Sequence, residues 1–145
     1  VGYAAISYVD VFVDGTASAN SETLDVTFKS ATPTSGNVSG KITDGLHATI
    51  TANNLTLNNP VTVTYTVQNK ETDVDASIIE ETLTNSNSQY FSVSTNVKTA
   101  KTVSKEDTLD VIVTVTLIKT PVAEADNSTN IDITFRATPV NNNTN

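Results

Sequence analysis

Cysteine, methionine and tryptophan are absent from the sequence, and glycine, proline and aromatic residues are few. Without cysteine the chain forms no disulfide, so its stability has to come from packing, sheet hydrogen bonds, partners or covalent links of another kind. The first residue is Val1 rather than methionine. We expect a processed, secreted chain whose signal peptide has been removed, and a trimmed sequence would look the same.

Long apolar runs are absent as well. A bilayer-spanning helix needs about 18 or more apolar residues, and no stretch approaches that length, so we expect no membrane span in the mature chain. Basic residues are scarce, because 8 Lys and Arg stand against 16 Asp and Glu and give a net charge of −8. A field of this sign argues against binding nucleic acid or an anionic membrane through a basic patch. The simplest role of the acidity is to keep an exposed surface soluble.

Threonine, asparagine and β-branched aliphatic residues dominate what is present. These residues favour strands and turns, while strong helix formers are few. At 145 residues the chain has room for one ordinary core. We therefore expect one all-β domain, a two-sheet antiparallel β-sandwich of about eight or nine strands with jelly-roll-like or immunoglobulin-like connections.

Alternation of apolar and polar residues marks the strands of this sandwich. The clearest cases are residues 61–69, which we expect to form a central strand, and residues 108–118, the longest run. Residues 23–29 and 131–137 follow the same pattern. The expected core-facing side chains are Leu24, Val26, Phe28, Val61, Val63, Tyr65, Val67, Leu109, Val111, Val113, Val115, Leu117, Ile131, Ile133 and Phe135.

Other segments are less regular. Asp44-Gly45 predicts a tight hairpin in which glycine accepts a positive φ. Residues 76–83 fit a short strand or a helical turn, and the neighbouring strands favour a strand. We expect residues 53–59 to form a loop and residues 97–105 a surface connection. In the run 89–95 we expect Phe91 and Val93 inward, with Tyr90 on the opposite face.

The stretch Tyr3–Asp14, YAAISYVDVFVD, is apolar on both faces of an extended backbone and needs cover on both. The segment 15–22 after it is small and polar, so it reads as a tether. The strand either folds back into its own domain or completes the sheet of a neighbouring molecule. The residues expected to act in a donated strand are Ala4, Ile6, Tyr8, Val9, Val11, Phe12 and Val13.

The expected division of the chain follows from these patterns. Residues 1–14 form the first strand, residues 15–22 the tether, residues 23–140 the sandwich, and residues 141–145 a polar tail. If the first strand is donated, its acceptor groove is expected to use core-facing residues of the long strands. We nominate Val111, Val113, Ile131 and Ile133.

Catalytic and metal-binding patterns are nearly absent. His47 is the only histidine and the chain has no cysteine, so a surface role is favoured over a metal site, which needs further nitrogen or sulfur ligands. The acidic turn with Glu71, Asp73 and Asp75 lacks the fixed glycine and final glutamate of a calcium loop. Adjacent strand residues such as Glu80 and Glu81 point to opposite faces and do not converge. We expect no enzyme, cofactor or metal.

The motif Asn-X-Ser/Thr occurs four times, in segments expected to be turns or tail. Such sites accept N-glycans in secreted proteins of organisms with the required machinery. The candidate asparagines are Asn37, Asn54, Asn127 and Asn142.

Three blocks resemble one family. They are VDVFVDGTASANSETLDVTFKS at the start, HATITANNLTLNNPVTVTYTVQNKETDVDASI in the middle, and DTLDVIVTVTLIKTP with NSTNIDITFRATPV at the end. Together they are similar to TasA/camelysin-like secreted proteins, and most of all to archaeal members that build extracellular pili. The resemblance implies a β-sandwich subunit that polymerises head to tail by donating its first strand, in biofilm or bundling fibres. The camelysin branch is also described as metalloprotease, which this chain lacks the ligands to support.

Two other functions remain open. A monomeric secreted module that binds carbohydrate or a cell-surface receptor would need exposed aromatic rings, and the chain offers no tryptophan and few tyrosines. A secreted protease is the remaining alternative. The leading interpretation is a pilus or biofilm subunit outside the cell whose main partner is itself, with N-glycans and lateral bundling as further possibilities.

Overall fold

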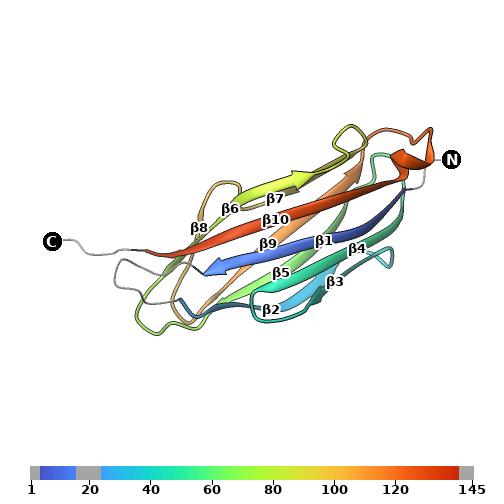
Figure 1. Cartoon of the computed structure of the whole chain (residues 1–145). Helices are drawn as coiled ribbons and strands as arrows, with labels where there is room; N and C mark the ends of the chain where they lie inside the picture. The colour runs from blue at the N-terminus through green and yellow to red at the C-terminus, as the bar shows by residue number, and fades with distance from the viewer. Residues whose placement is uncertain (1–3, 16–23, 141–145) are drawn as a thin grey trace.

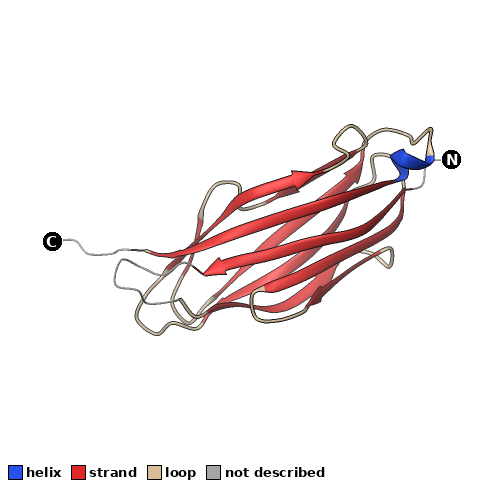
Figure 2. Cartoon of the chain, in the orientation of Figure 1, coloured by secondary structure: helices blue, strands red, loops and turns tan. Residues whose placement is uncertain are grey.

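The computed structural model describes residues 4–15 and 24–140 and is all-β there, with ten strands, one short 3-10 helix and no α-helix. Figure 1 labels the strands and Figure 2 colours them by type. Their bounds are β1 Ala4–Gly15, β2 Val26–Pro33, β3 Val38–Ile42, β4 His47–Leu55, β5 Val61–Asn69, β6 Ala76–Asn85, β7 Phe91–Thr95, β8 Lys101–Val103, β9 Thr108–Leu117 and β10 Ser128–Pro139, with the 3-10 helix η1 at Glu124–Asn127.

The strands form two sheets that enclose a shared core, an arrangement consistent with a β-sandwich (Figure 1). The six-stranded sheet has the order β3-β4-β1-β10-β6-β8, and the four-stranded sheet has the order β2-β5-β9-β7. Every described strand pairing is antiparallel except that of β1 with β10, which is parallel. The expectation of purely antiparallel sheets is therefore wrong for this one pair.

The four-stranded sheet confirms the clearest alternation in the sequence. β5 lies between β2 and β9, as expected of a central strand, and Val63, Tyr65 and Val67 on it are fully buried. On β9 the buried residues are Val111, Val113, Val115 and Leu117, while the residues between them are partly exposed. Side chains alternate between the two faces of a strand, so a spacing of two residues places the valine rows of β5 and β9 in the core.

The last strand, β10, is also buried as predicted. Ile131, Ile133 and Phe135 have at most 1% of their surface exposed. The strand is longer than expected and begins at Ser128, directly after η1. Leu24, Val26 and Phe28 are buried as well, and residues 76–85 form the strand β6 rather than a helical turn.

Several local predictions are wrong. Asn53–Leu55 belongs to β4 rather than to a loop, and Tyr90 is buried with 7% exposure instead of facing outward. Residues 97–105 carry the buried Val97 and the strand β8, since that segment covers one end of β6. The β3–β4 hairpin exists, but no described glycine has a positive φ.

The β3–β4 turn is closed by a side chain instead of a glycine conformation. The Asp44 carboxylate accepts hydrogen bonds from the backbone N–H groups of Leu46 (2.9 Å) and His47 (3.0 Å). These bonds, with the neighbouring His47 ring, hold the pKa of Asp44 below its usual range. An aspartate that binds the backbone two or three residues later is a common way to make such a turn.

The two ends of the molecule are distinct, and we call them the head pole and the tail pole. The head pole contains η1 and the turns 56–60 and 86–90, joined by the hydrogen bonds Asn58 N to Leu117 O and Ile118 N to Tyr90 O, both 2.8 Å. The tail pole contains the turns 70–75 and 104–107, joined by Glu106 N to Glu71 O at 3.0 Å. In Figure 1 the head pole lies at the right.

Candidate functional site

The candidate site is the place in the six-stranded sheet between β4 and β10, which β1 occupies and which we call the β1 slot. β1 runs antiparallel to β4 and parallel to β10. It begins at the head pole, where Ala4 is paired with Leu55 and Ala5 with Ser128, and ends at the tail pole, where Gly15 is paired with Ala137. A strand in this position pairs on both of its edges.

The register of β1 sets its residues against the core-facing positions of β10. Val9, Val11 and Val13 stand opposite Ile131, Ile133 and Phe135, all three of which are buried. The remaining predicted donor residues pair at Ala4 with Leu55, Ile6 with Ala52 and Thr129, Tyr8 with Asn130, and Phe12 with His47 and Thr134. The valine spacing thus coincides with the apolar row of β10.

The predicted groove residues fall into two groups. Ile131 and Ile133 lie on β10, directly beside β1. Val111 and Val113 are equally buried but lie on β9 in the other sheet, which pairs with β5 and β7 and not with β1. Only the first group is brought to the slot by backbone pairing, and the acceptor role of all four stays a prediction.

Beside the slot, β4 is tied to the opposite sheet by Tyr65. Its hydroxyl group donates a 2.7 Å hydrogen bond to the backbone carbonyl of Thr49. Thr49 is paired with Asp10 of β1 on one side and with Lys41 of β3 on the other. Burial raises the pKa of Tyr65 far above its usual value, so the hydroxyl stays protonated as a donor. Sequence analysis found Tyr65 as a core residue and gave no sign of this bond.

The two sheets approach closely next to this bond, at Gly40 on β3. A Cβ atom on Gly40 would lie 2.5 Å from Cγ1 of Val63 and 3.2 Å from the Tyr65 hydroxyl oxygen. A side chain does not fit there without a shift of the core. Glycine is therefore needed for close packing, although the sequence pattern did not single it out.

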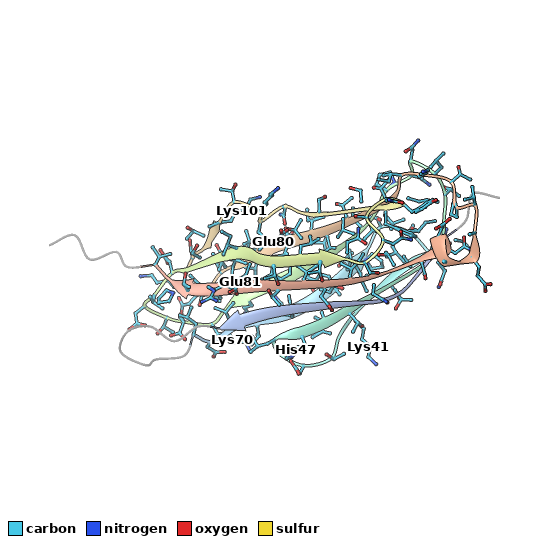
Figure 3. All side chains as sticks on the ribbon, turned by 45° about the horizontal axis from the view of Figure 1, so that its top comes forward. Lys41, His47, Lys70, Glu80, Glu81 and Lys101 are labelled. Carbon is cyan, nitrogen blue, oxygen red and sulfur yellow. The ribbon has the colours of Figure 1, made fainter. Side chains whose placement is uncertain are left out.

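The ionisable residues named as catalytic candidates do not converge. Figure 3 shows His47, on β4, apart from Glu80 and Glu81, which are neighbours on β6. The His47 Nδ1 atom lies 2.9 Å from an Asp44 carboxylate oxygen. Glu80 accepts a 2.6 Å bond from the Thr95 hydroxyl, whereas Glu81 forms an ion pair with Arg136. Each carboxylate has a local structural partner.

Residues 4–15 and 24–140 contain neither a cluster of metal ligands nor a membrane-spanning helix. In that part of the chain no group of three or more His, Asp, Glu or Cys residues could hold a metal ion. Two carboxylates of the acidic turn bind backbone groups instead: Glu71 accepts from Asp25 N (2.7 Å) and Asp75 accepts from Lys105 N (2.9 Å). The same residues include no helix long and apolar enough to cross a membrane.

Aromatic side chains offer no binding platform in the region 24–140. All five aromatic residues there are less than 9% exposed. They are Phe28, Tyr65, Tyr90, Phe91 and Phe135. Tyr90 also lies beside Asp126, and burial together with that carboxylate raises its pKa.

The candidate glycan sites gather at the head pole. Asn37, Asn54 and Asn127 are exposed, and Asn37 and Asn54 line the same hollow of about 290 Å³. Asn54 lies in β4 with φ 56°, so it is not the loop residue expected from sequence. The Thr129 hydroxyl of the third site is buried and hydrogen-bonded to Asn85. Asn142 lies outside the described residues.

Comparison with family models, curated proteins and solved structures finds no match to this chain. The similarity to TasA/camelysin-like proteins is therefore carried only by the sequence blocks quoted above.

Proposed function

We propose that this protein is the structural subunit of an extracellular filament, a pilus or biofilm fibre, that polymerises head to tail when β1 of one subunit completes the sheet of the next. The observation that carries the proposal is the position of β1 inside the six-stranded sheet. A first strand at the edge of a sheet is paired on one side only, so its departure breaks one ladder of hydrogen bonds. Here departure of β1 exposes the edges of both β4 and β10.

Two open edges favour refilling by an identical strand. Unpaired strand edges present rows of N–H and C=O groups that attract another strand. Five or so apolar side chains buried from the donated strand would contribute on the order of 8–15 kcal/mol before ordering costs. A second copy of the chain supplies a strand with the matching valine spacing, so self-association needs no other partner.

The remaining parts of the proposal follow from the same interpretation. A filament of this kind is secreted, carries N-glycans on exposed sites, and is able to bundle laterally. Its subunit is a β-sandwich with jelly-roll-like or immunoglobulin-like connections and a donor strand. The alternative of a carbohydrate-binding module is less well supported, because the aromatic side chains between residues 24 and 140 are buried.

Deletion of residues 1–14 tests the proposal. The truncated subunit should form no long fibres under the electron microscope, should cap fibres of the intact chain, and should bind a synthetic Tyr3–Asp14 peptide. A control peptide in which Val9, Val11 and Val13 are replaced by serine should not bind. Ordinary fibres formed by the truncated chain alone would refute the function.

A further inference from the structure

We propose that a donated β1 lies in the neighbour's slot in the direction opposite to the one it takes in its own chain. This inference rests on the proposed filament and adds the polarity of the exchanged strand. In its own chain β1 is parallel to β10. In the filament it is antiparallel to β10 and parallel to β4.

The first argument is where the linking segment begins and ends. Gly15 is paired with Ala137 at the tail pole, and the Asp25 carbonyl accepts a 2.8 Å bond from Lys70 N at the same pole. The nine residues between Gly15 and Asp25 let these two anchors lie at most about 36 Å apart. The 12 residues of β1 also span about 36 Å from first to last Cα atom. Even fully extended, the linking segment therefore has no residue left over to pass along a neighbour and turn into its slot from the far end.

This restriction decides the direction. In a head-to-tail filament the tail pole of the donor meets the head pole of the acceptor. The donated strand then enters the slot at the head pole, with Gly15 there and Ala4 toward the tail pole. If the strand kept its original direction, the two tail poles would have to lie side by side, which suits a reciprocal dimer and not an end-to-end chain.

The second argument is the symmetry of the strand sequence. Val9, Val11 and Val13 are identical residues at equal spacing, centred on Val11. A reversal about Val11 keeps Val11 opposite Ile133 and exchanges the two outer valines, so valine again stands opposite Ile131 and Phe135. Because the strand period is two residues, reversal preserves which positions share a face along the regular stretch 8–15, which lies beyond the register shift between Ile6 and Tyr8.

Charge and hydrogen bonding are compatible with the reversed strand. In the original register Asp10 is the residue paired with Asp132. After reversal about Val11, Asp10 stands opposite Thr134 and Phe12 opposite Asp132. One parallel and one antiparallel ladder are present in both directions, so no ladder is lost.

The head pole also carries exposed apolar surface. Among the described residues, the exposed large hydrophobic side chains are Leu57 (41% exposed), Ile118 (45%) and Val122 (84%). All three lie in head-pole loops, next to the end of the slot where the reversed strand enters. Surface of this kind is consistent with contact between this pole and a second copy of the chain.

Disulfide trapping distinguishes the two directions, since the wild-type chain has no cysteine. One cysteine is placed at Asn130, and the second at either Tyr8 or Asp14. Tyr8 is paired with Asn130 in the original direction, whereas reversal about Val11 brings Asp14 to that position. The two alternatives are about 20 Å apart along the strand. Assembly under reducing conditions, followed by oxidation, keeps the cysteines from constraining folding.

Each result has a distinct meaning. The expected result is that N130C/D14C fibres give a ladder of covalent oligomers on a denaturing gel, while N130C/Y8C fibres give none between chains. A parallel set with the acceptor cysteine at Asp132 detects a slip of two residues. Covalent oligomers from N130C/Y8C, or fibres that give no covalent oligomers with any pair, would overturn the reversal but not the filament proposal. Monomers cross-linked only within the chain, without fibres, overturn the filament as well.

Discussion

The two sheets are closed in different ways. In the four-stranded sheet every ladder is antiparallel, and the apolar rows of β2, β5 and β9 all face one core. In the six-stranded sheet an interior position is filled by β1, and β1 makes the one parallel ladder among the described strands. The difference teaches that the four-stranded sheet follows from local alternation strand by strand, while the six-stranded sheet is completed by a long-range pairing of β1 with β10.

The largest expected effect on stability is in the four-stranded sheet. Val113→Asp should prevent folding, because an unpaired carboxylate at this fully buried position costs several kcal/mol. Thr114→Asp is the matched control on the partly exposed face of β9 and should be mild. Circular dichroism and urea unfolding measure both, and equal tolerance would contradict the assigned faces.

A smaller effect is expected where the two sheets touch. Gly40→Ala should lower the free energy of unfolding by about 1–3 kcal/mol, because the new Cβ atom overlaps Val63. Gly36→Ala is the control, since a Cβ atom there meets nothing within 4 Å. Denaturant midpoints compare the variants. If Gly40→Ala matched the control, the sheets would not be closely packed at β3.

The hydrogen bond of Tyr65 to Thr49 offers a finer comparison. Tyr65→Phe should cost about 1–2 kcal/mol, because the part-buried Thr49 carbonyl loses its donor from the other sheet.

The same substitution should change the response to alkaline pH. The folded pKa of Tyr65 is raised above the unfolded value of about 10. Its contribution to stability is therefore complete below pH 10 and is lost progressively as the pH rises above that value. The phenylalanine variant should lose less stability than wild type between pH 10 and 11. Parallel pH profiles of the two proteins would argue against a buried tyrosine donor.

A weaker effect is expected on the exposed face of the six-stranded sheet. Glu81→Gln should change stability by less than about 1 kcal/mol, because the Glu81–Arg136 pair is partly exposed to solvent. Added salt should reduce even this difference. Thermal unfolding at low and high ionic strength measures it, and a loss of several kcal/mol would mean that the pair is shielded from water.

The smallest effect on stability is expected at the glycan sites. Asn37→Gln and Asn127→Gln should leave unfolding almost unchanged, since both residues are exposed. Each should remove one glycan mass from protein made in the native source. Intact mass equal to the bare polypeptide in native material would disprove glycosylation. Glycans at the head pole would also reduce the area left for contact between subunits, so unglycosylated protein should assemble at least as fast.

Much of the core followed from alternation alone. β5 was predicted from end to end, and the buried faces of β9 and β10 were assigned correctly because each has one polar face. The alternation does not show which residues are covered by distant parts of the chain, so the burial of Tyr90 and Val97 was not predicted. It also says nothing about contacts between sheets, which is why the roles of Gly40 and of the Tyr65 hydroxyl came only from the structure.

The slot itself was harder to predict. A strand that is apolar on both faces has no preferred side, so its sequence indicates burial without naming its neighbours. Of the four nominated groove residues, Ile131 and Ile133 lie on the strand that pairs with β1 in this structure, whereas Val111 and Val113 belong to the other sheet. Long-range pairing and its parallel direction depend on the whole chain and leave no local signal.

The pairing of β1 with β10 has a consequence for the time course of folding. The two strands stand at opposite ends of the described chain, while β3 and β4 form a local hairpin. Contacts between distant segments form slowly, because the intervening chain must first be ordered. During synthesis β1 leaves the ribosome before β10 does. Throughout that interval β1 is without one of its two neighbours, and a molecule in which β10 has paired with β6 before β1 returns presents an open sheet edge to its surroundings.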